Sequence, residues 1–185
     1  KPKNILKIAN EGVLADGMEP VFPSKTFPNH LTLVTGVYPN QHGIEHNNFY
    51  HRELQKVYKL GDGKNNTNWV TGTPIWLYAQ KHGLNTAIYF WPESEAKING
   101  QYPDIYFPYK HNTANKDRID QVKQWLMLPP DKRPSFIASY FSTVDSAGHD
   151  FGRHSKELKE AISQIDTLIG HLYQFIKENS IPVNL

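Results

Sequence analysis

The stretch TAIYF, residues 86–90, is short, almost entirely apolar and bounded by helical and loop patterns. A continuous apolar run of this length predicts a strand that is buried on both faces. A second run of the same kind, FIASYF, occupies residues 136–141. Helices that alternate with short apolar strands are typical of a parallel sheet covered on both faces. The sequence therefore predicts an α/β fold with a mainly parallel sheet flanked by helices.

Working outward from these strands, the clearest helical pattern is the last one. Its apolar residues follow the 3.6-residue period from Leu158 to Ile176, and Ser155 stands before it as a cap. The other expected helices are Lys3–Glu11, Phe27–Thr35, a helix that starts at Thr73-Pro74 and stops at Gly83, and Asp117–Leu128.

The remaining segments give weaker signals. Residues 37–58 and 91–111 are expected to be loops, because prolines, glycines and asparagines interrupt them. Residues 181–185, IPVNL, resemble the start of a third strand. We therefore expect residues 1–185 to be part of one larger catalytic domain, truncated at both ends.

Composition excludes several classes of site and partner. The chain has 185 residues and a net charge of +2, which is too mild to indicate binding to a nucleic-acid duplex or a membrane surface. No apolar run is long enough to span a membrane, and no signal peptide is visible. Cysteine is absent, so a metal ion would need the 9 histidines and the carboxylates as ligands.

The segment KTFPNH, residues 25–30, places Thr26 at the expected start of a helix. A helix N-terminus carries unpaired N–H groups and partial positive charge, and phosphate groups bind there readily. One interpretation is an ordinary N-cap, in which Ser24 or Thr26 accepts a backbone hydrogen bond. The other is a hydroxyl nucleophile directed at phosphorus, which would need a base or a metal to become reactive at neutral pH.

Metal ligands are suggested by YFSTVDSAGHDFG, residues 140–152, which follows the FIASYF strand. Ligands bind outside the carboxyl ends of strands in a parallel sheet. Asp145 and His149 are expected to flank a glycine-containing turn and to point at one ion, and such a pair suits zinc. Asp150 and His154 are competitors for the same role. The alternative interpretation is an Asx-turn beside a surface histidine.

Taken together, the segments PVFPSKTFPNHLTLVTGVYPNQHGIEHNN, PIWLYAQKHGLNTAIYFWPESEAKING, YPDIYFPYKHN and DSAGHDFG resemble the nucleotide pyrophosphatase/phosphodiesterase family. This family of type I phosphodiesterases is a branch of the alkaline phosphatase superfamily. The segments occur in the family's order and cover nearly the whole chain. KTFPNH…TGVYPNQHG joined to DSAGH is the most specific part of the resemblance.

The resemblance implies a mechanism residue by residue. Thr26 matches the family's nucleophile, which forms a phospho-threonine intermediate that water then hydrolyses. The family binds two Zn²⁺ ions. The nucleophile's hydroxyl coordinates one of them, and Asp145 and His149 match two ligands of the other. Asn47 matches an amide that donates to a phosphate oxygen, as developing charge requires.

The same resemblance implies how a nucleotide is held. Phe27 matches a residue that stacks on one face of a base, and Tyr109 matches its partner on the other face. Trp91 is expected to line the same pocket, although a purely core role is the alternative. Lys25 is expected to steer the anionic substrate or to be an ordinary solvated lysine. His42 is interpreted as structural.

The chain departs from the family's pattern in two ways. The family has six protein ligands for its two zinc ions, whereas only Asp145 and His149 occur here, and no SDHG-type motif is present. We therefore expect residues 1–185 alone to bind zinc weakly and to have little or no hydrolytic activity. Glu93 stands where family members often carry glycine, and its carboxylate is expected to lie near the pocket.

Three functions remain in competition at this level. The first is zinc-dependent hydrolysis of nucleotide phosphodiester or pyrophosphate bonds, with nucleotides, nucleotide sugars or dinucleotides as substrates. The second is a lysophospholipid or alkyl phosphodiester hydrolase on the same scaffold, and the third is a nucleotide-binding protein without catalysis. Phe27 and Tyr109 favour nucleotides. The resemblance implies an extracellular or periplasmic protein, and the sequence sets no oligomeric state.

Overall fold

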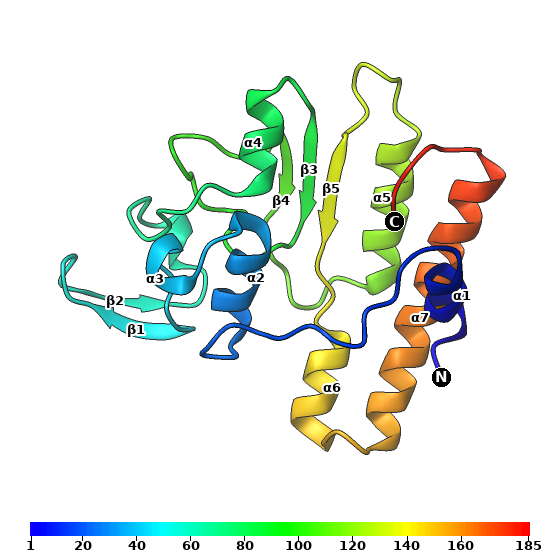
Figure 1. The fold of residues 1–185 in the computed structure, drawn as a ribbon, viewed down its shortest axis with the longest axis horizontal. Helices are drawn as coiled ribbons and strands as arrows, with labels where there is room; N and C mark the ends of the chain where they lie inside the picture. Colours follow the sequence, from blue (N-terminus) through cyan, green and yellow to red (C-terminus); the bar gives the residue numbers. More distant parts are fainter. The chain divides into compact units, whose positions relative to one another are not determined.

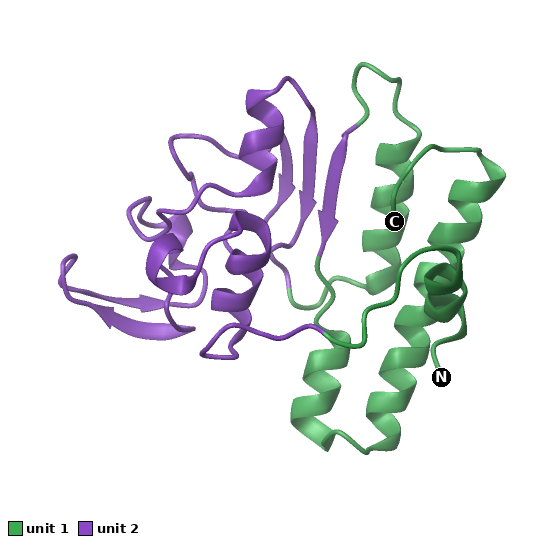
Figure 2. Ribbon diagram, viewed as in Figure 1, with its two compact units in different colours: residues 1–17, 111–133, 140–185 green, residues 18–110, 134–139 purple.

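The computed structural model describes residues 1–185, which form two compact units (Figure 2). The first unit comprises residues 1–17, 111–133 and 140–185, and the second comprises residues 18–110 and 134–139. Each unit is considered by itself below. Thr26, Asn47 and the candidate base-binding aromatics belong to the second unit, whereas Asp145 and His149 belong to the first.

The second unit is built on a three-stranded parallel sheet in the order β4-β3-β5 (Figure 1). Its strands are β3 (Thr86–Tyr89), β4 (Ile105–Phe107) and β5 (Phe136–Ser139). Every residue of the central strand β3 is buried, as its apolar sequence predicts. The α/β fold and the parallel sheet are thereby confirmed.

Strand β4 lies inside a segment that the sequence analysis assigned to a loop, so that prediction was wrong. The strand is only three residues long and stands between Pro103 and Pro108. It forms because β3 offers a pairing edge, with Ala87 opposite Ile105. The Asp104 carboxylate fixes the entry to β4 by accepting hydrogen bonds from the backbone N–H (2.8 Å) and the hydroxyl (3.1 Å) of Thr86.

The other elements of the second unit precede the sheet in the chain. They are α2 (Thr26–Thr35), α3 (Pro39–His42), β1 (Asn48–His51), β2 (Lys56–Lys59), the 3₁₀ turn η1 (Asp62–Lys64) and α4 (Ile75–Lys81). β1 and β2 form an antiparallel hairpin, which corrects the expectation of a loop throughout residues 37–58. Helix α2 ends at Gly36, whose φ of 69° is the left-handed conformation that glycine adopts easily.

A core rich in aromatic residues holds the second unit together. It contains residues from α2, β2, α4 and β3 and from segments adjoining them: Leu31, Val34, Ile44, Tyr58, Trp69, Val70, Trp76, Leu77, Ile88, Ala96 and Ile98. Phe27 and Trp91 pack against this core from its edge and remain partly exposed. The core therefore supports two of the residues that the sequence analysis assigned to substrate binding.

The first unit is helical and consists of α1 (Lys3–Glu11), α5 (Asn115–Leu126), α6 (Thr143–Phe151) and α7 (Lys156–Glu178). Helix α7 contacts each of the other three helices (Figure 1). The predicted cap of α7 is confirmed, because Ser155 Oγ accepts a hydrogen bond of 3.1 Å from the Leu158 N–H. Asp166, on α7, accepts hydrogen bonds from the N–H groups of Asn4 (3.1 Å) and Ile5 (2.8 Å) at the start of α1.

Two local predictions in this unit were wrong. Residues 143–151 form α6 rather than a glycine-containing turn. Residues 181–185 have no regular secondary structure, so the expected strand is not formed. A strand needs a neighbour for its backbone N–H and C=O groups, and no strand pairs with these residues.

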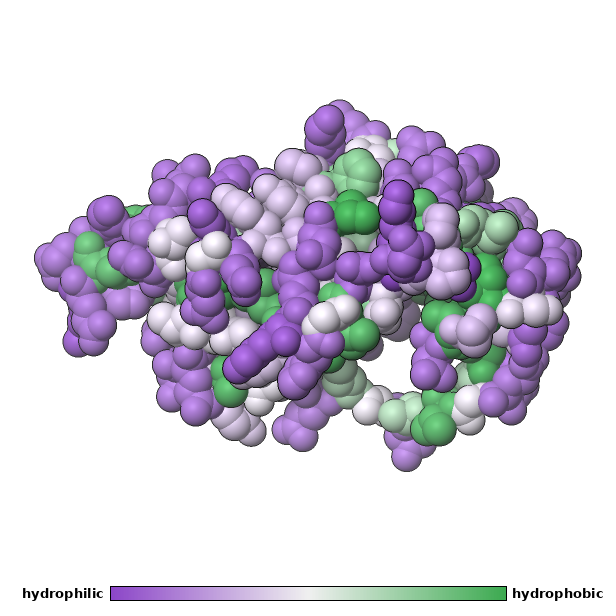
Figure 3. Space-filling model, turned by 90° about the horizontal axis from the view of Figure 1, so that it is seen from above, coloured by the Kyte–Doolittle hydropathy of each residue, from purple (hydrophilic) through white to green (hydrophobic).

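No helix in residues 1–185 combines the length and the apolar character needed to cross a membrane. On the face drawn in Figure 3, hydrophobic side chains are divided into separate patches among hydrophilic ones.

Candidate active site

Thr26 is the first residue of α2, and Lys25, in an extended conformation, is the N-cap. No side chain caps this helix, so the interpretation of Ser24 or Thr26 as an ordinary N-cap is not what the structure shows. The Thr26 hydroxyl is partly exposed at the positive end of the helix dipole. Thr26 therefore lies at a helix end that favours anionic groups.

The approach to α2 is held by Asn29. Its side-chain amide donates to the backbone oxygens of Pro23 (3.1 Å) and Lys25 (2.8 Å), and its Oδ1 accepts from the Val21 N–H (2.9 Å). Buried Pro28 has a fixed φ suited to the first helical turn. These contacts fix the backbone on both sides of Thr26, so its position does not depend on a capping hydroxyl.

Asn47 is brought directly to the same helix end. Its Oδ1 accepts a hydrogen bond of 3.0 Å from the Phe27 N–H, which is one of the donors that an α-helix leaves unpaired at its N-terminus. This contact orients the amide, because the oxygen is engaged and the Nδ2 group is left to donate elsewhere. The Asn47 Nδ2 group is not used in this contact and can donate to another acceptor.

Two predicted aromatic residues are anchored to α2 or to the core next to it. The Phe27 ring meets Tyr58 edge-on, with centroids 6.5 Å apart. The Trp91 indole N–H donates to the carbonyl of His30 (3.2 Å), and its ring meets the His30 imidazole edge-on at 5.1 Å. Trp91 is therefore fixed one turn along the helix that begins with Thr26.

Tyr109 is positioned by a residue that the sequence analysis did not assign. The Glu95 carboxylate accepts a hydrogen bond of 2.8 Å from the Tyr109 N–H, and its other oxygen lies 3.8 Å from the Lys64 ammonium. The Tyr109 side chain is 42% exposed and meets Phe90 edge-on at 5.3 Å. Nothing in the local pattern WPESE distinguishes Glu95 from a solvated carboxylate.

Glu93 faces inward, and its carboxyl group is buried instead of projecting into an open pocket. It accepts a hydrogen bond from the Tyr58 hydroxyl and a longer one, of 3.4 Å, from the Gly63 N–H. The residue is only 4% exposed. Its φ is 61°, a backbone conformation that residues other than glycine rarely adopt. Burial raises the pKa of the Glu93 carboxyl from 4.5 to about 7.

His42 has the structural environment that the sequence analysis assigned to it. It is fully buried, its Nε2 lies 3.1 Å from the Thr32 hydroxyl, and its Nδ1 accepts from the Ile44 N–H at 3.3 Å. Burial lowers the pKa of the His42 imidazole to about 4, so the ring is neutral at physiological pH.

In the first unit, Asp145 and His149 lie one turn apart on α6 with a separation of 3.6 Å between Oδ1 and Nε2. Residues four apart share one face of a helix, so both side chains lie on the same face of α6. Both side chains are exposed, at 58% for Asp145 and 80% for His149. A ligand from solvent can therefore reach both.

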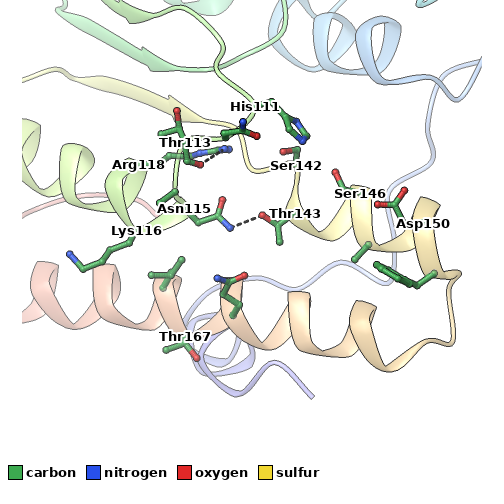
Figure 4. A pocket seen from close by; sticks show the side chains of 16 residues that line it. His111, Thr113, Asn115, Lys116, Arg118, Ser142, Thr143, Ser146, Asp150 and Thr167 are labelled. Carbon is green, nitrogen blue, oxygen red and sulfur yellow. Dashed lines mark hydrogen bonds between the residues drawn. The ribbon is translucent and has the colours of Figure 1, made fainter.

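The two competitors are placed differently. Asp150 lies on another side of α6, at the wall of a cavity of about 700 Å³ lined by the start of α5, by α6 and by α7 (Figure 4). That cavity includes neither Asp145 nor His149. His154 follows the end of α6, and its Nε2 accepts a hydrogen bond of 2.9 Å from Arg153. The structure thus pairs His149 with Asp145 only.

The donor types of this pair fit a zinc ion, because carboxylate oxygen and imidazole nitrogen are both common zinc ligands. The structure contains no group of three or more histidine, aspartate or glutamate side chains that could hold a metal ion. Zinc usually takes four protein or water donors, of which this pair alone would supply two.

Comparison with known proteins establishes the family. The sequence profile described as "Type I phosphodiesterase / nucleotide pyrophosphatase" matches residues 2–185. The chain therefore belongs to this family, and the resemblance drawn from the sequence motifs is confirmed.

Curated relatives are considerably longer than this chain. Ectonucleotide pyrophosphatase/phosphodiesterase family member 1 of Homo sapiens is 41% identical over 175 residues, which cover 94% of this chain and 19% of the relative. Venom phosphodiesterase of Naja atra is 41% identical over 179 residues, which cover 96% of this chain and 22% of the relative. The chain thus spans about a fifth of their length.

Solved structures of the family match the fold. Murine ectonucleotide pyrophosphatase/phosphodiesterase 5 gives a TM-score of 0.89 at 29% identity, with 97% of this chain and 48% of that chain covered. A second structure of the murine protein is an inactive variant, with one threonine replaced by alanine, in complex with AMP. It gives a TM-score of 0.88, also at 29% identity, and covers 96% of this chain and 48% of that chain.

Proposed function

We propose that the protein containing this chain hydrolyses nucleotide phosphodiester or pyrophosphate bonds, with Thr26 as the nucleophile. The proposal rests on Thr26, which is the first residue of a helix that no side chain caps. Asn47 binds the same helix end through the Phe27 N–H, and the chain belongs to a phosphodiesterase family. The murine variant that lacks a threonine and is described as inactive, in complex with AMP, supports both the residue type and the substrate class.

The reaction has two displacement steps. In the first, the Thr26 oxygen forms a bond to phosphorus and releases its proton to solvent, while the bond from phosphorus to the leaving oxygen breaks and that oxygen keeps the electron pair. The product is a phosphodiester between Thr26 and the nucleotide, with the alcohol or phosphate leaving group released. In the second step, a water oxygen forms a bond to phosphorus and the Thr26–phosphorus bond breaks. One water proton restores the Thr26 hydroxyl, the other passes to solvent, and a nucleoside monophosphate leaves.

Charge on the phosphoryl oxygens during both steps is stabilised by preorganised donors. The Asn47 Nδ2 group donates to one oxygen, because its Oδ1 is already occupied by the Phe27 N–H. The positive end of α2 adds partial charge of the right sign. Lys25, exposed just before Thr26, attracts the anionic substrate toward this helix end.

Asp145 and His149 would contribute to holding one of two zinc ions in the complete domain, because they are adjacent, exposed and of suitable donor type. When bound, zinc supplies a Lewis acid that lowers the pKa of a coordinated oxygen, which makes hydroxyl groups reactive at neutral pH. The residues of this chain supply the nucleophile, the amide donor and the base-binding aromatics.

Phe27 and Tyr109 bind the nucleobase by stacking, and Trp91 lines the same pocket. Replacing Phe27 or Tyr109 with alanine should raise KM for a nitrophenyl nucleotide ester by about 5- to 150-fold, since each stacked aromatic contributes ~1–3 kcal/mol. The measurement is steady-state kinetics on the whole protein, with methyl 4-nitrophenyl phosphate as a substrate that lacks a base.

The matched control is Tyr78→Ala, which removes an exposed tyrosine of α4 and should leave both substrates unaffected. Equal losses on the ester without a base would show that Phe27 and Tyr109 support the fold instead of the nucleobase. Faster hydrolysis of 4-nitrophenyl phosphocholine than of the nucleotide ester would favour a lysophospholipid or alkyl phosphodiester hydrolase.

Residues 1–185 alone should bind zinc weakly and hydrolyse little or no nucleotide ester. The physical reason is that two ligands rarely hold an ion that needs a closed set. Zinc content after dialysis and turnover of the nitrophenyl ester by the purified chain are the measurements. Turnover at rates typical of enzymes would contradict this expectation.

We further propose that residues 1–185 are part of one catalytic domain and that the protein acts outside the cytoplasm. The second proposal rests on relatives named ectonucleotide pyrophosphatase/phosphodiesterase.

A further inference from the structure

The turn formed by residues 91–95 connects the parts of the candidate nucleotide pocket. At one end, the Trp91 indole N–H donates to the His30 carbonyl of α2. At the other end, the Glu95 carboxylate accepts from the Tyr109 N–H. Between them, the Ser94 N–H donates to the Trp91 carbonyl at 3.0 Å, which closes the turn. The arrangement leaves Glu93 at the centre of the turn with its side chain directed into the protein.

The Glu93 carboxyl reaches across to the segment that follows β2. Its Oε1 accepts from both the Tyr58 hydroxyl and the Gly63 N–H, whereas its Oε2 is buried and has no hydrogen-bond partner. Gly63 permits this approach, because a Cβ atom there would collide with the Glu93 carboxyl group and contact Ala96. The contact thus depends on a matched pair of residues 30 positions apart in the chain.

Tyr58 contacts both the Glu93 carboxyl and Phe27 of the candidate nucleotide pocket. Its ring is fully buried and packs against Phe49, at 5.2 Å, and Trp69, at 5.3 Å. Phe27 meets the same Tyr58 ring edge-on. A hydroxyl held by Glu93 fixes how this ring lies beneath Phe27, so the Glu93 carboxyl links the support of Phe27 to the turn that carries Trp91.

The backbone of Glu93 indicates that these contacts hold it in place. A non-glycine residue with a φ of 61° costs conformational energy, and such a conformation persists only where surrounding interactions maintain it. The buried carboxyl with its two donors supplies that restraint. Glycine would adopt this backbone freely but would leave Tyr58 without its acceptor.

We propose that Glu93 is a positioning residue for nucleotide binding, which acts through Tyr58 on Phe27 and through the 91–95 turn on Trp91. The inference rests on the proposed function in one respect, namely that these aromatics bind the nucleobase. It assigns to Glu93 the setting of base affinity, and no direct contact with the substrate is required.

The arrangement makes base affinity depend on pH. Burial raises the pKa of Glu93 to about 7, so the carboxyl is mostly protonated at pH 6 and mostly ionised at pH 8. The charged and titratable groups that act on it are Tyr58 from β2, Asp62 from η1 and Glu95 from the turn. Asp62 and Glu95 oppose the ionised form, and Lys64 is paired with Glu95. Ionisation therefore favours opening of the turn to water, and base affinity falls as the pH rises.

The test measures equilibrium binding in the whole protein carrying Thr26→Ala, so that no turnover is needed. AMP and ribose 5-phosphate are titrated calorimetrically at pH 6, 7 and 8. For each protein we take the ratio of the Kd for AMP at pH 8 to that at pH 6. This ratio should be about fivefold larger with Glu93 than with Glu93→Gln, which is at the lower end of typical coupling between sites. The second ionisation of AMP, near pH 6, affects both variants equally and cancels in the ratio.

Two controls separate positioning from a general structural effect. Ribose 5-phosphate lacks a base, so its pH profile should be the same in both variants. Glu53→Gln makes the same chemical change at an exposed position in the β1–β2 hairpin and should leave the AMP profile of the parent unchanged. Tyr58→Phe, which keeps the ring and removes the hydroxyl, should weaken AMP binding at every pH without affecting ribose 5-phosphate.

Identical AMP profiles with Glu93 and Glu93→Gln would overturn the proposal, as would equal effects on ribose 5-phosphate. Absence of AMP binding in every variant would overturn it together with the base pocket. Hydrolysis by the protein with Thr26 intact is measured separately. If that protein binds AMP with the expected pH dependence but does not hydrolyse nucleotide esters, the positioning role stands and the catalytic proposal falls.

Discussion

Replacing Thr26 with alanine should lower kcat/KM for a nitrophenyl nucleotide ester by at least roughly 10³-fold in the whole protein. The substitution removes the oxygen that forms the bond to phosphorus. It leaves the helix intact, because no side chain caps α2 and Asn29 holds the preceding backbone. Affinity for AMP should change little. The measurements are steady-state kinetics and calorimetric AMP titration on the same preparation.

Thr26→Ser is the matched variant, because it keeps a hydroxyl on the same carbon and changes only a methyl group. It should retain a substantial part of the activity that Thr26→Ala loses. Activity that survives in Thr26→Ala, within tenfold of the parent, would mean that the Thr26 hydroxyl is not the nucleophile. The two-step mechanism would then have to be abandoned.

Replacing His149 with alanine should remove one of the two zinc ions expected in the whole protein and lower hydrolysis by more than roughly 100-fold. Mutation of a residue that only hydrogen-bonds to a zinc ligand lowers metal affinity or activity by about 10- to 100-fold. Loss of a ligand itself should therefore have at least as large an effect. His149 is exposed and lies one turn from Asp145, so its loss should not disturb the packing of α6. Zinc per chain by mass spectrometry and hydrolysis rates are measured together.

The chain offers a close control five residues away. His154→Ala removes an imidazole that lies beyond the end of α6 and contacts Arg153. This variant should keep both zinc and activity. In the same way, Asp145→Ala should lose zinc and activity, whereas Asp150→Ala should keep both. Zinc loss in His154→Ala comparable to that in His149→Ala would contradict the assignment of ligands.

The parts of the fold that were predictable are those whose pattern is local and long. Helix α7 has a sustained apolar period and a serine cap, and both appear in the structure. Strands β3 and β5 are continuous apolar runs, and they pair in parallel as expected. These strong local patterns decide the elements without distant contacts. The prediction that both strands are buried on both faces was wrong for β5, whose residues are all only partly buried.

The elements that were missed depend on contacts distant in sequence. β4 is short and flanked by prolines, and its pairing with β3 decides its conformation. In the β1–β2 hairpin, Tyr58 is fully buried and packs against Phe27 and Trp69 from outside the hairpin. Helix α6 contains Gly148 and several small polar residues, which are weak helix formers, and its contacts with α7 favour the helix.

In the candidate site, too, some features follow from local sequence and others depend on contacts distant in sequence. The position of Thr26 at a helix start followed from Pro28 and the apolar residues after it, and the structure places it there. The inward orientation of Glu93 could not be read from WPES, because it is fixed by Tyr58 and Gly63, which are 35 and 30 residues away. Burial of a carboxyl is a property of such long-range neighbours, and local sequence carries no signal for it.

The most direct test of the central claim is to trap the covalent nucleotide on Thr26. The whole protein is mixed with a nitrophenyl ester of thymidine monophosphate, quenched in acid during turnover and digested for peptide mass spectrometry. We expect the peptide containing Thr26 to gain the mass of one thymidylyl group, and the Thr26→Ala variant to gain none. Rapid hydrolysis with Thr26 unmodified, or with the nucleotide attached to another residue, would contradict it.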